Sequence, residues 1–507
     1  MHDVIVVGAG SSGCALAARA SEDPNRTVLL LEAGPDYSDL SALPFDLMNG
    51  HNNSYSAHDW KFAHFPTQER EIRFPRGRVV GGSSAVNTAI ALRGMPEDFD
   101  EWAGLGLSEW SWCGVLPAYK RLERDLDFGD CDYHGDAGPI TIRRYPPAEM
   151  GLQHTAFLEA ARGLGYPDCP DANDPDGWGA GPQPMNKLGR LRISCAIGYL
   201  APARVRPNLV IRAETSVRRI LVDNGRCVGV EVRTPDGGIE ALHAKLVVLS
   251  AGAIMTPAIL MRSGLGPAEQ LERHSIPVVR DMPGVGRNLS DHPALSVTLR
   301  PRDPAIIDHD APIIQTILRY TAEGSDKRND LQIEMISFSG KKEAPQFAIA
   351  GVLEYQYGRG EITLASADPD APPVIHQRFC EDERDLARLV ACYQDVLAFA
   401  RTKPIVDLVE NIDFPRGGNP TADEIAMLIR RFAGSGYHPC GTAKMGVAED
   451  ADAVVDQYGR CRAVDGLAIA DASIMPFVPR ANTNLTAIMI GEKAGEWLRT
   501  RPAIYGL

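Results

Sequence analysis

The chain opens with an apolar run that breaks into a glycine-rich turn and continues as an alanine-rich segment. Residues 4–7 are Val-Ile-Val-Val, the turn is Gly-Ala-Gly-Ser-Ser-Gly over residues 8–13, and alanine dominates residues 14–20. A short apolar run bounded by turn residues predicts a fully buried strand, and alanine favours a helix. A second apolar run at residues 27–31 predicts another buried strand. The pattern is typical of a parallel sheet with helices packed on it.

Further along, two kinds of pattern alternate. Apolar runs predict strands at residues 208–211, 217–221, 227–232 and 246–250, and the last leads through a glycine turn at 251–253 into a short helix. Residues 331–336 and 361–365 instead alternate apolar and polar positions, as half-buried antiparallel strands do. A long helix is predicted from Glu383 to about Thr402, and its stripe of apolar residues indicates core packing: Leu386, Leu389, Val390 and Tyr393.

The order of these patterns predicts an α/β protein, α+β overall, with two interleaved domains. We assign residues 1–135, 196–293 and 431–507 to a Rossmann-like nucleotide-binding domain, and residues 136–195 and 294–430 to a second domain built on an antiparallel sheet. A length of 507 residues is too great for one ordinary core. Residues 37–60 have little periodicity and predict a long loop, which could cover a site as a lid.

Charge and cysteine usage narrow the class of protein. Acidic residues outnumber basic ones, 66 to 52, without a basic cluster, which argues against nucleic acid and anionic membranes as partners. No apolar run approaches a membrane span, and the first strand leaves no room for a leader, so we expect a cytoplasmic protein. The ten cysteines form no CxxC pair, and we predict neither disulfides nor a metal site. The pairs Cys131 with His134 and His438 with Cys440 lack a second pair at ligand spacing.

The first turn fits a dinucleotide-binding fingerprint. Gly8 permits the tight turn, Gly10 lets the backbone approach a pyrophosphate, and Gly13 lets the helix pack on the strand. Glu32, 19 positions after Gly13, is placed to hold ribose hydroxyls and to repel the 2′-phosphate of NADP. Similar turns also occur without a ligand, and the motif does not choose between NAD and FAD.

Two later segments carry further candidate chemistry. Residues 77–87 contain adjacent glycines and serines, so they form either a loop against a planar ligand or a plain surface turn. Near the end, His438 lies in a glycine-flanked loop, and Asp471 follows an apolar run that predicts a strand. Asn482 or Asn484 is expected to cap a helix that runs to Leu498 and to direct its N-terminus at an electron-rich ring.

With these segments in place, the sequence resembles the glucose-methanol-choline family of flavin-dependent alcohol oxidoreductases over nearly its whole length. Both signature segments of the family are present, at residues 77–94 and 252–266. Residues 283–289, the His438 loop, and Asp471 with the asparagine turn also look like the family.

The resemblance implies FAD rather than NAD. Members with a histidyl-linked flavin carry that histidine where this chain has Val86, so we predict noncovalent FAD. By position, the resemblance assigns cofactor contacts to these residues: Gly8, Gly10, Ser11, Ser12, Gly13, Glu32, Ala33, Trp60, Val80, Gly81, Ser84, Asn87, Val217, Tyr437, Asp471, Asn482 and Thr483.

The family's catalytic histidine corresponds to His438, and its partner position to Asn482. Hydride leaves an alcohol carbon readily only as the hydroxyl proton is removed, so a base is needed beside the flavin, and His438 is our candidate. Asn482 could donate a hydrogen bond to the developing alkoxide. We expect a small primary alcohol, with a mild preference for a heteroaromatic substrate such as pyridoxine that stacks on Tyr437 and Trp60; Trp60 could equally pack on the flavin or the core.

Other readings stay open at this point. A 5-hydroxymethylfurfural or aryl-alcohol oxidase fits the same residues, and a choline-type enzyme could form its cage from Tyr320, Tyr355, Tyr357 and Glu334. A hydroxynitrile lyase would use the histidine without net redox chemistry. A noncatalytic binding protein would be expected to have lost His438 or Asn482. The electron acceptor, O2 or another, and the choice between monomer and dimer do not follow from the sequence.

Overall fold

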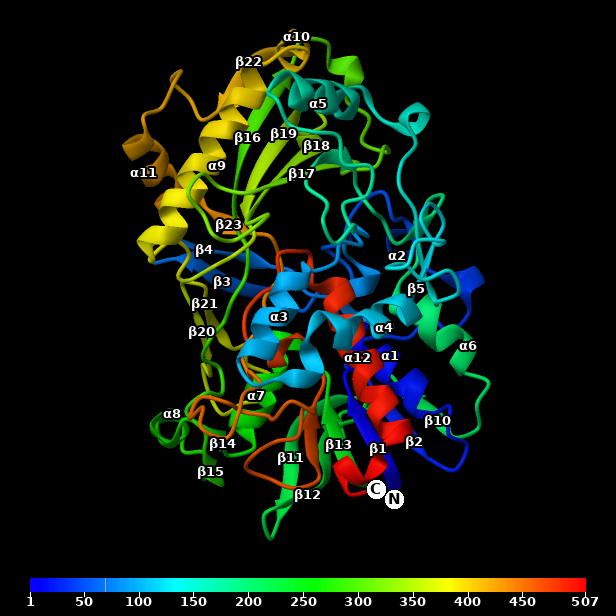
Figure 1. Ribbon diagram of the computed structural model, residues 1–507. Coiled ribbons are helices and arrows are strands. Elements are labelled where there is room, and N and C mark those ends of the chain that lie inside the picture. The colour runs from blue at the N-terminus through cyan, green and yellow to red at the C-terminus, as the bar shows by residue number, and fades with distance from the viewer. Residues whose placement is uncertain (69) are drawn as a thin grey trace.

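The computed structural model describes residues 1–68 and 70–507. Two seven-stranded sheets lie toward opposite ends of the molecule, as Figure 1 shows. The first sheet has the order β10-β2-β1-β13-β12-β11, with β24 paired to β13. Its strands are β1 (His2–Val7), β2 (Val28–Leu31), β10 (Leu209–Arg212), β11 (Ser216–Asp223), β12 (Arg226–Arg233), β13 (Ile239–Leu249) and β24 (Leu467–Ile469).

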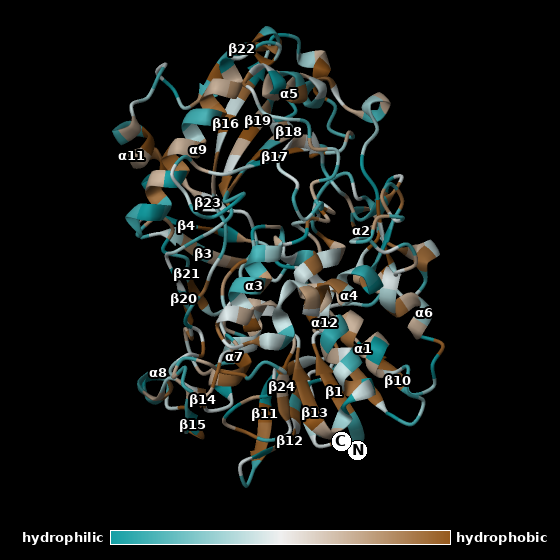
Figure 2. Cartoon of the chain, in the orientation of Figure 1, coloured by the Kyte–Doolittle hydropathy of each residue, from teal (hydrophilic) through white to brown (hydrophobic). Residues whose placement is uncertain are grey.

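The centre of the first sheet is parallel and buried on both faces. Strand β1 pairs in parallel with β2 and with β13, and residues 4–7 of β1 are buried. Figure 2 shows these strands as hydrophobic. Helix α1 (Ser11–Ala20) follows β1, and helix α12 (Thr483–Thr500), from the other end of the chain, lies beside it. The Ser12 hydroxyl donates to the Ala487 carbonyl at 2.6 Å, which joins the first turn to the last long helix.

The second sheet is antiparallel and has the order β22-β16-β19-β18-β17-β7, with β23 paired to β16. Its longest strand confirms the alternation predicted for residues 331–336. Side chains on one face of β18 are buried in the core against α9: Leu331, Ile333 and Met335. The strands are β7 (Gly179–Pro182), β16 (Pro293–Pro301), β17 (Thr316–Tyr320), β18 (Leu331–Lys341), β19 (Ala344–Leu353), β22 (Val409–Phe414) and β23 (Gly434–Ser435); α9 is Glu383–Arg401.

A third sheet of four strands has the order β20-β21-β3-β4. Its strands are β3 (Phe62–Thr67), β4 (Arg70–Phe74), β20 (Glu361–Thr363) and β21 (Val374–His376). The remaining helices are α2 (Phe45–Met48), α3 (Pro96–Gly104), α4 (Trp112–Leu122), α5 (Leu152–Gly163), α6 (Ala201–Ala203), α7 (Gly252–Arg262), α8 (Ala268–Arg273), α10 (Ile405–Leu408) and α11 (Ala422–Phe432). Short strand pairs are β5 (Glu123–Asp125) with β6 (Ile140–Ile142), β8 (Lys187–Leu188) with β9 (Leu191–Arg192), and β14 (Leu265–Gly266) with β15 (Arg280–Asp281).

The predicted α/β class is confirmed. The predicted elements differ from the observed ones at their ends, and β3, β4, α3 and α4 were not predicted. The apolar run after Gly466 forms a strand of only three residues, Leu467–Ile469, because the chain then turns at Asp471. The loop at residues 37–60 includes α2, and the buried Arg192 guanidinium anchors it by hydrogen bonds to its backbone carbonyls. That group donates to the carbonyls of Leu47 at 2.7 Å and Asn49 at 2.9 Å. No helix among the described residues is long and apolar enough to cross a membrane.

Candidate active site

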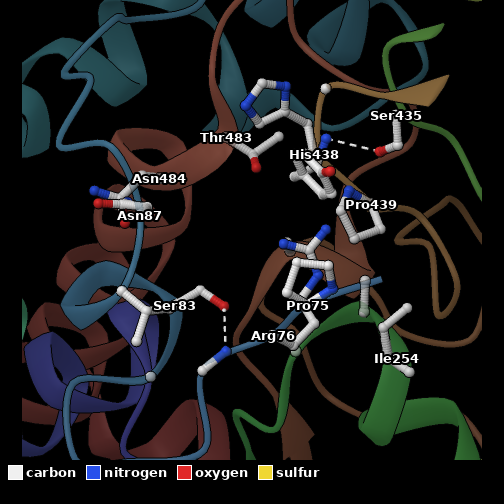
Figure 3. A pocket seen from close by; sticks show the side chains of 18 of the residues that line it. Pro75, Arg76, Ser83, Asn87, Ile254, Ser435, His438, Pro439, Thr483 and Asn484 are labelled. Carbon is white, nitrogen blue, oxygen red and sulfur yellow. Dashed lines mark hydrogen bonds between the residues drawn. The ribbon is translucent and has the colours of Figure 1, made fainter. Parts of the chain in front are cut away.

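A cavity of about 820 Å³ lies between the first two sheets and takes its lining from distant parts of the chain. It includes the first glycine turn, residues 215–217, residues 250–255, the His438 loop and the start of α12, as well as β16, β18 and β19. Figure 3 shows Ser83, Asn87 and Asn484 on one side, with His438, Pro439 and Arg76 on the other.

One end of the cavity has the geometry of a nucleotide site. Glu32, at the end of β2, is buried, and its carboxylate accepts hydrogen bonds from the backbone N–H groups of Ala9 at 3.0 Å and Gly34 at 2.8 Å. Burial raises the pKa of Glu32 to about 7, while these backbone donors oppose the rise. The carboxylate therefore braces the glycine turn as well as lining the cavity.

The space beside the turn is open where a dinucleotide needs it. A Cβ added to Gly10 would meet no heavy atom within 4 Å, and Gly10 lines the cavity. A Cβ at Gly13 would instead lie 1.9 Å from the Gly8 carbonyl oxygen, so Gly13 serves the packing of α1 on β1. Deeper in, Asn482 Oδ1 and Asn484 Nδ2 are buried without a hydrogen-bond partner in the described structure. An elongated polar ligand such as FAD fits this lining, because it would satisfy both groups.

The reaction centre is built around His438, which faces the cavity. Asn482 Nδ2 lies 2.9 Å from His438 Nε2, and His292 Nδ1 lies 2.9 Å from His438 Nδ1. An amide nitrogen donates only, so Nε2 of His438 accepts, and the neutral ring carries its proton on Nδ1 and donates it to His292. The pKa of His438 is held well below 6.5 by burial, by His292 and by the Arg76 guanidinium. His438 is therefore a neutral base with its lone pair at the cavity.

The Asp291 carboxylate holds the His438 loop in place through several hydrogen bonds. Asp291 accepts from the His438 backbone N–H at 2.8 Å, from the Ser435 hydroxyl at 2.6 Å and from Gln377 Nε2 at 2.9 Å. Glu354 Oε2 lies 3.4 Å from His292 Nδ1. These residues were absent from the sequence-based prediction, although Asp291 and His292 follow directly on the family segment at residues 283–289.

Fourteen of the predicted site residues line the cavity: Gly8, Gly10, Ser11, Ser12, Glu32, Ala33, Trp60, Asn87, Val217, Tyr437, His438, Asp471, Asn482 and Thr483. Gly13, Val80, Gly81 and Ser84 lie behind it. Val80 is buried, the Gly81 N–H donates to the Ala9 carbonyl at 2.7 Å, and the Ser84 hydroxyl donates to the Gly81 carbonyl at 2.6 Å. Val80, Gly81 and Ser84 shape the loop that faces the first glycine turn, and Gly13 belongs to α1.

Asn482 occupies the N-cap position of α12, as predicted, but without a capping hydrogen bond from its side chain. The side chain instead contacts His438. Asn484 lies inside the helix, where its Oδ1 accepts from the Ser11 hydroxyl at 2.8 Å. Both amides are engaged across the cavity wall, which leaves the helix N–H groups free for a ligand.

Tyr437 and Trp60 lie in different settings within the lining. Tyr437 is 38% exposed, has a positive φ of 67°, and packs near Tyr55 with ring centroids 5.6 Å apart. Trp60 stacks on Phe62 at 5.7 Å, with the Arg78 guanidinium over its ring. Trp60 thus has protein partners on its ring, while Tyr437 retains an exposed side.

Two family models described as GMC oxidoreductase match residues 2–294 and 356–491 of this chain. The chain belongs to the GMC oxidoreductase family. It is 35% identical to a 5-(hydroxymethyl)furfural oxidase from Methylovorus sp. (strain MP688), with 99% of each chain covered. It is 35% identical to an oxygen-dependent choline dehydrogenase from Chromohalobacter salexigens, with 99% of this chain and 95% of the relative covered.

Among solved structures, the chain is similar to pyridoxine 4-oxidase from Mesorbium loti, with a TM-score of 0.91 and 28% identity over 98% of this chain and 99% of that one. The resemblance seen in the sequence and the prediction of an enzyme that oxidises alcohols are confirmed as GMC oxidoreductase membership. The same findings support FAD as the cofactor and a small-molecule alcohol, with an electron acceptor, as partners.

Proposed function

We propose that this GMC oxidoreductase oxidises a small primary alcohol, R–CH2OH with an aromatic or heteroaromatic R such as pyridoxine, to the aldehyde, with O2 as electron acceptor. The observation that carries the proposal is the pair His438 and Asn482, which presents a neutral base and an amide donor to one point of the cavity. The likeness to a furfural-alcohol oxidase and to pyridoxine 4-oxidase supports an aromatic substrate.

In this proposal the substrate hydroxyl binds beside the Asn482–His438 pair and replaces the amide N–H of Asn482 as the donor to His438 Nε2. His438 Nε2 removes the hydroxyl proton, and its Nδ1–H continues to donate to His292, which keeps the ring oriented. The second N–H of Asn482 donates to the oxygen as negative charge develops there, an interaction stronger in the transition state than in the ground state. Bound FAD would supply the hydride acceptor for the carbinol carbon.

The residues that would hold FAD follow from the lining. Gly10, Ser11 and Ser12 would offer backbone and hydroxyl donors to the pyrophosphate, Glu32 would accept from the ribose hydroxyls, and Val217 would contact the adenine. Asn87, Asp471 and Thr483 line the part of the cavity assigned to the ribityl chain and the flavin ring.

We propose that the FAD is noncovalent. Val86, at the position of the histidyl linkage in other members, is a buried aliphatic side chain packed with Leu47, Val79 and Ala85. An aliphatic side chain offers no nucleophile to the flavin. Acid precipitation of the yellow protein should therefore release all the flavin into the supernatant as intact FAD. Flavin retained in the washed pellet would contradict this prediction.

The proposed activity is tested by anaerobic mixing of the purified protein with pyridoxine, 5-(hydroxymethyl)furfural, benzyl alcohol and choline in turn, followed by admission of air. We expect an aromatic alcohol to bleach the flavin absorbance and air to restore it with formation of peroxide. If choline alone bleached the flavin, the substrate would be a choline-type alcohol and not an aromatic one. Slow reoxidation of the flavin by air would identify a dehydrogenase. If no alcohol bleached the flavin, the redox proposal would fail and a lyase activity would take its place.

A further inference from the structure

A buried guanidinium joins two loops of the cavity wall, which we call the outer loop (residues 37–60) and the inner loop (residues 77–87). Arg192, on β9, is fully buried. Among the described residues, all the hydrogen bonds of its guanidinium go to backbone carbonyls of these two loops. They are, in the outer loop, Asp46 at 3.0 Å, Leu47 at 2.7 Å, Asn49 at 2.9 Å and Asn52, and, in the inner loop, Ala85 at 2.7 Å and Asn87 at 3.0 Å.

Backbone carbonyls, rather than an ion pair, compensate the charge of Arg192 in the described structure. Burial lowers the pKa of Arg192 to about 10, against smaller opposing effects of Tyr55 and Asp46, so the guanidinium remains protonated at neutral pH. A buried charged group is tolerated only while its hydrogen bonds are made, and each unpaired N–H costs free energy. If either loop moved away, several N–H groups of Arg192 would lose their acceptors together. The guanidinium therefore favours the state in which both loops are in place.

Both loops also line the cavity. The inner loop contributes Val86 and Asn87, and the outer loop contributes Tyr55. A backbone hydrogen bond of 2.8 Å from the Ser54 N–H to the Val86 carbonyl joins the two loops next to these residues. Residues 46–52, by contrast, lie outside the cavity lining in the described structure. Arg192 therefore connects a stretch that a ligand in the cavity does not touch to a loop that such a ligand does touch.

Tyr55 brings the outer loop to the reaction centre. Its ring centroid lies 5.6 Å from that of Tyr437, the residue before His438. Asn52, whose carbonyl accepts from Arg192, precedes Tyr55 closely in the chain. The two tyrosine rings thus form an aromatic pair beside the base, and the position of this pair depends on the part of the outer loop that Arg192 holds.

We propose that Arg192 is a positioning residue that makes the placing of Tyr55 beside the base depend on an occupied cofactor site. With FAD bound, the inner loop is fixed, Arg192 holds the outer loop against it, and Tyr55 is kept on Tyr437 to receive the ring of the substrate. Coupling of this kind is reciprocal, so an ordered outer loop also strengthens FAD binding. The role toward the substrate ring rests on the proposed function, whereas the coupling of the two loops does not.

Hydrogen exchange of the backbone amides at residues 46–52, followed by mass spectrometry, tests the coupling. In the wild type we expect these amides to exchange roughly tenfold more slowly with FAD than without it, a typical strength of coupling between two sites. Arg192→Lys keeps the charge but offers a single ammonium to the carbonyls of both loops, so most of this slowing should be lost at saturating FAD. Equal slowing in the two proteins, or none in the wild type, overturns the inference.

Arg190→Met is the matched control. Arg190 lies two residues from Arg192 and donates to the Asp310 carbonyl at 3.2 Å, outside both loops. FAD should slow exchange at residues 46–52 in this variant as it does in the wild type. A purely structural role of Arg192 would speed exchange equally with and without FAD, which would leave the ratio unchanged and overturn the inference. Arg192→Gln, which removes the charge but keeps two N–H donors, is the second variant and should also lose most of the slowing.

Kinetics separate this inference from the proposed function. Tyr55→Ala should keep the FAD-dependent slowing at residues 46–52 but raise KM for benzyl alcohol roughly threefold to tenfold, more than it lowers kcat. An unchanged KM would overturn the role of Tyr55. If no alcohol reduced the flavin while the slowing was still lost in Arg192→Lys, the proposed function would fail and the coupling of the loops would stand.

Discussion

At the scale of single residues, the site depends on a histidine whose neighbours keep it neutral. His438 combines contacts to Asn482 on one nitrogen and to His292 on the other, so its tautomer is determined by hydrogen bonds rather than by solvent. Burial and the positive charge of Arg76 lower its pKa, which keeps the lone pair of Nε2 available over most of the physiological pH range.

Replacing the base tests this arrangement directly. His438→Ala should retain FAD but reduce flavin about 10² to 10⁴ times more slowly, the usual contribution of a positioned base. Stopped-flow absorbance under anaerobic conditions measures the rate. His243→Ala, which alters an exposed histidine on β13, is the matched control and should keep the wild-type rate. A His438→Ala variant as fast as the control would refute the assignment.

The pH dependence follows from the direction of the pKa shift. Protonation of His438 inactivates the base, so the rate of flavin reduction should fall at acidic pH. Because the pKa of His438 is lowered below 6.5, this fall should occur below pH 6.5. Arg76→Gln removes one cause of the lowering and should move the acid limb to higher pH. The profile of flavin reduction against pH, recorded for both proteins, measures the shift. An acid limb at the same pH in both would show that Arg76 does not act on His438.

At the scale of elements, the first strand, turn and helix form a unit in which two glycines have different tasks. Gly13 lies where α1 presses on β1, while Gly10 faces open space in the cavity and has a φ of −81° that alanine accepts. The fingerprint in the sequence already predicted these two roles, and the structure adds which atoms surround each position.

This difference predicts contrasting variants. Gly10→Ala should leave the thermal midpoint of the flavin-free protein almost unchanged but weaken FAD binding roughly tenfold to hundredfold, because its methyl group enters the ligand space. Gly13→Ala should lower the midpoint even without FAD, since its Cβ meets the Gly8 carbonyl at 1.9 Å. Thermal unfolding and FAD titration of both variants measure the effects. Equal loss of stability in the two would contradict the assignment.

At the scale of the whole molecule, a buried ionic network lies apart from the cavity. Glu123, Asp125 and His134 lie close enough to hold a metal ion, but Arg144 donates to Asp125 at 2.7 Å and Arg93 donates to Glu123. The His134 side chain bonds to Glu123 at 2.7 Å and to Asp171 at 2.8 Å. Three buried carboxylates therefore face two guanidinium groups and one imidazole, and the charges of these buried groups balance when His134 is protonated; the more exposed Asp127 lies 3.6 Å from Arg144.

The network makes stability depend on pH. Burial lowers the pKa of His134, but hydrogen bonds to Asp171 and Glu123 raise it above 6.5 overall. A folded-state pKa above the unfolded value contributes stability that is complete below about pH 6.5 and is lost as the pH rises through the folded value.

His134→Gln should therefore destabilise the protein by about 3 kcal/mol near pH 6, where it removes a buried charge partner, and by less near pH 9. Urea unfolding followed by circular dichroism at the two pH values gives the difference. His243→Gln, at the exposed histidine, should change stability little at either pH. An effect of His134→Gln that is larger at the higher pH would show that the ring is neutral in the folded protein.

The sequence by itself determined the buried strands, the glycine turn, the long helix over Glu383 to Arg401 and the family, because these depend on local pattern and on short motifs. It also identified His438 and Asn482. Only the tertiary structure placed Asp291, His292 and Glu354 behind the base and showed that the Asn482 side chain contacts the histidine rather than a backbone N–H of α12. The reason is physical. Periodicity reports which side of an element is buried, whereas the partner of a buried polar group depends on the packing of elements that lie far apart in the chain.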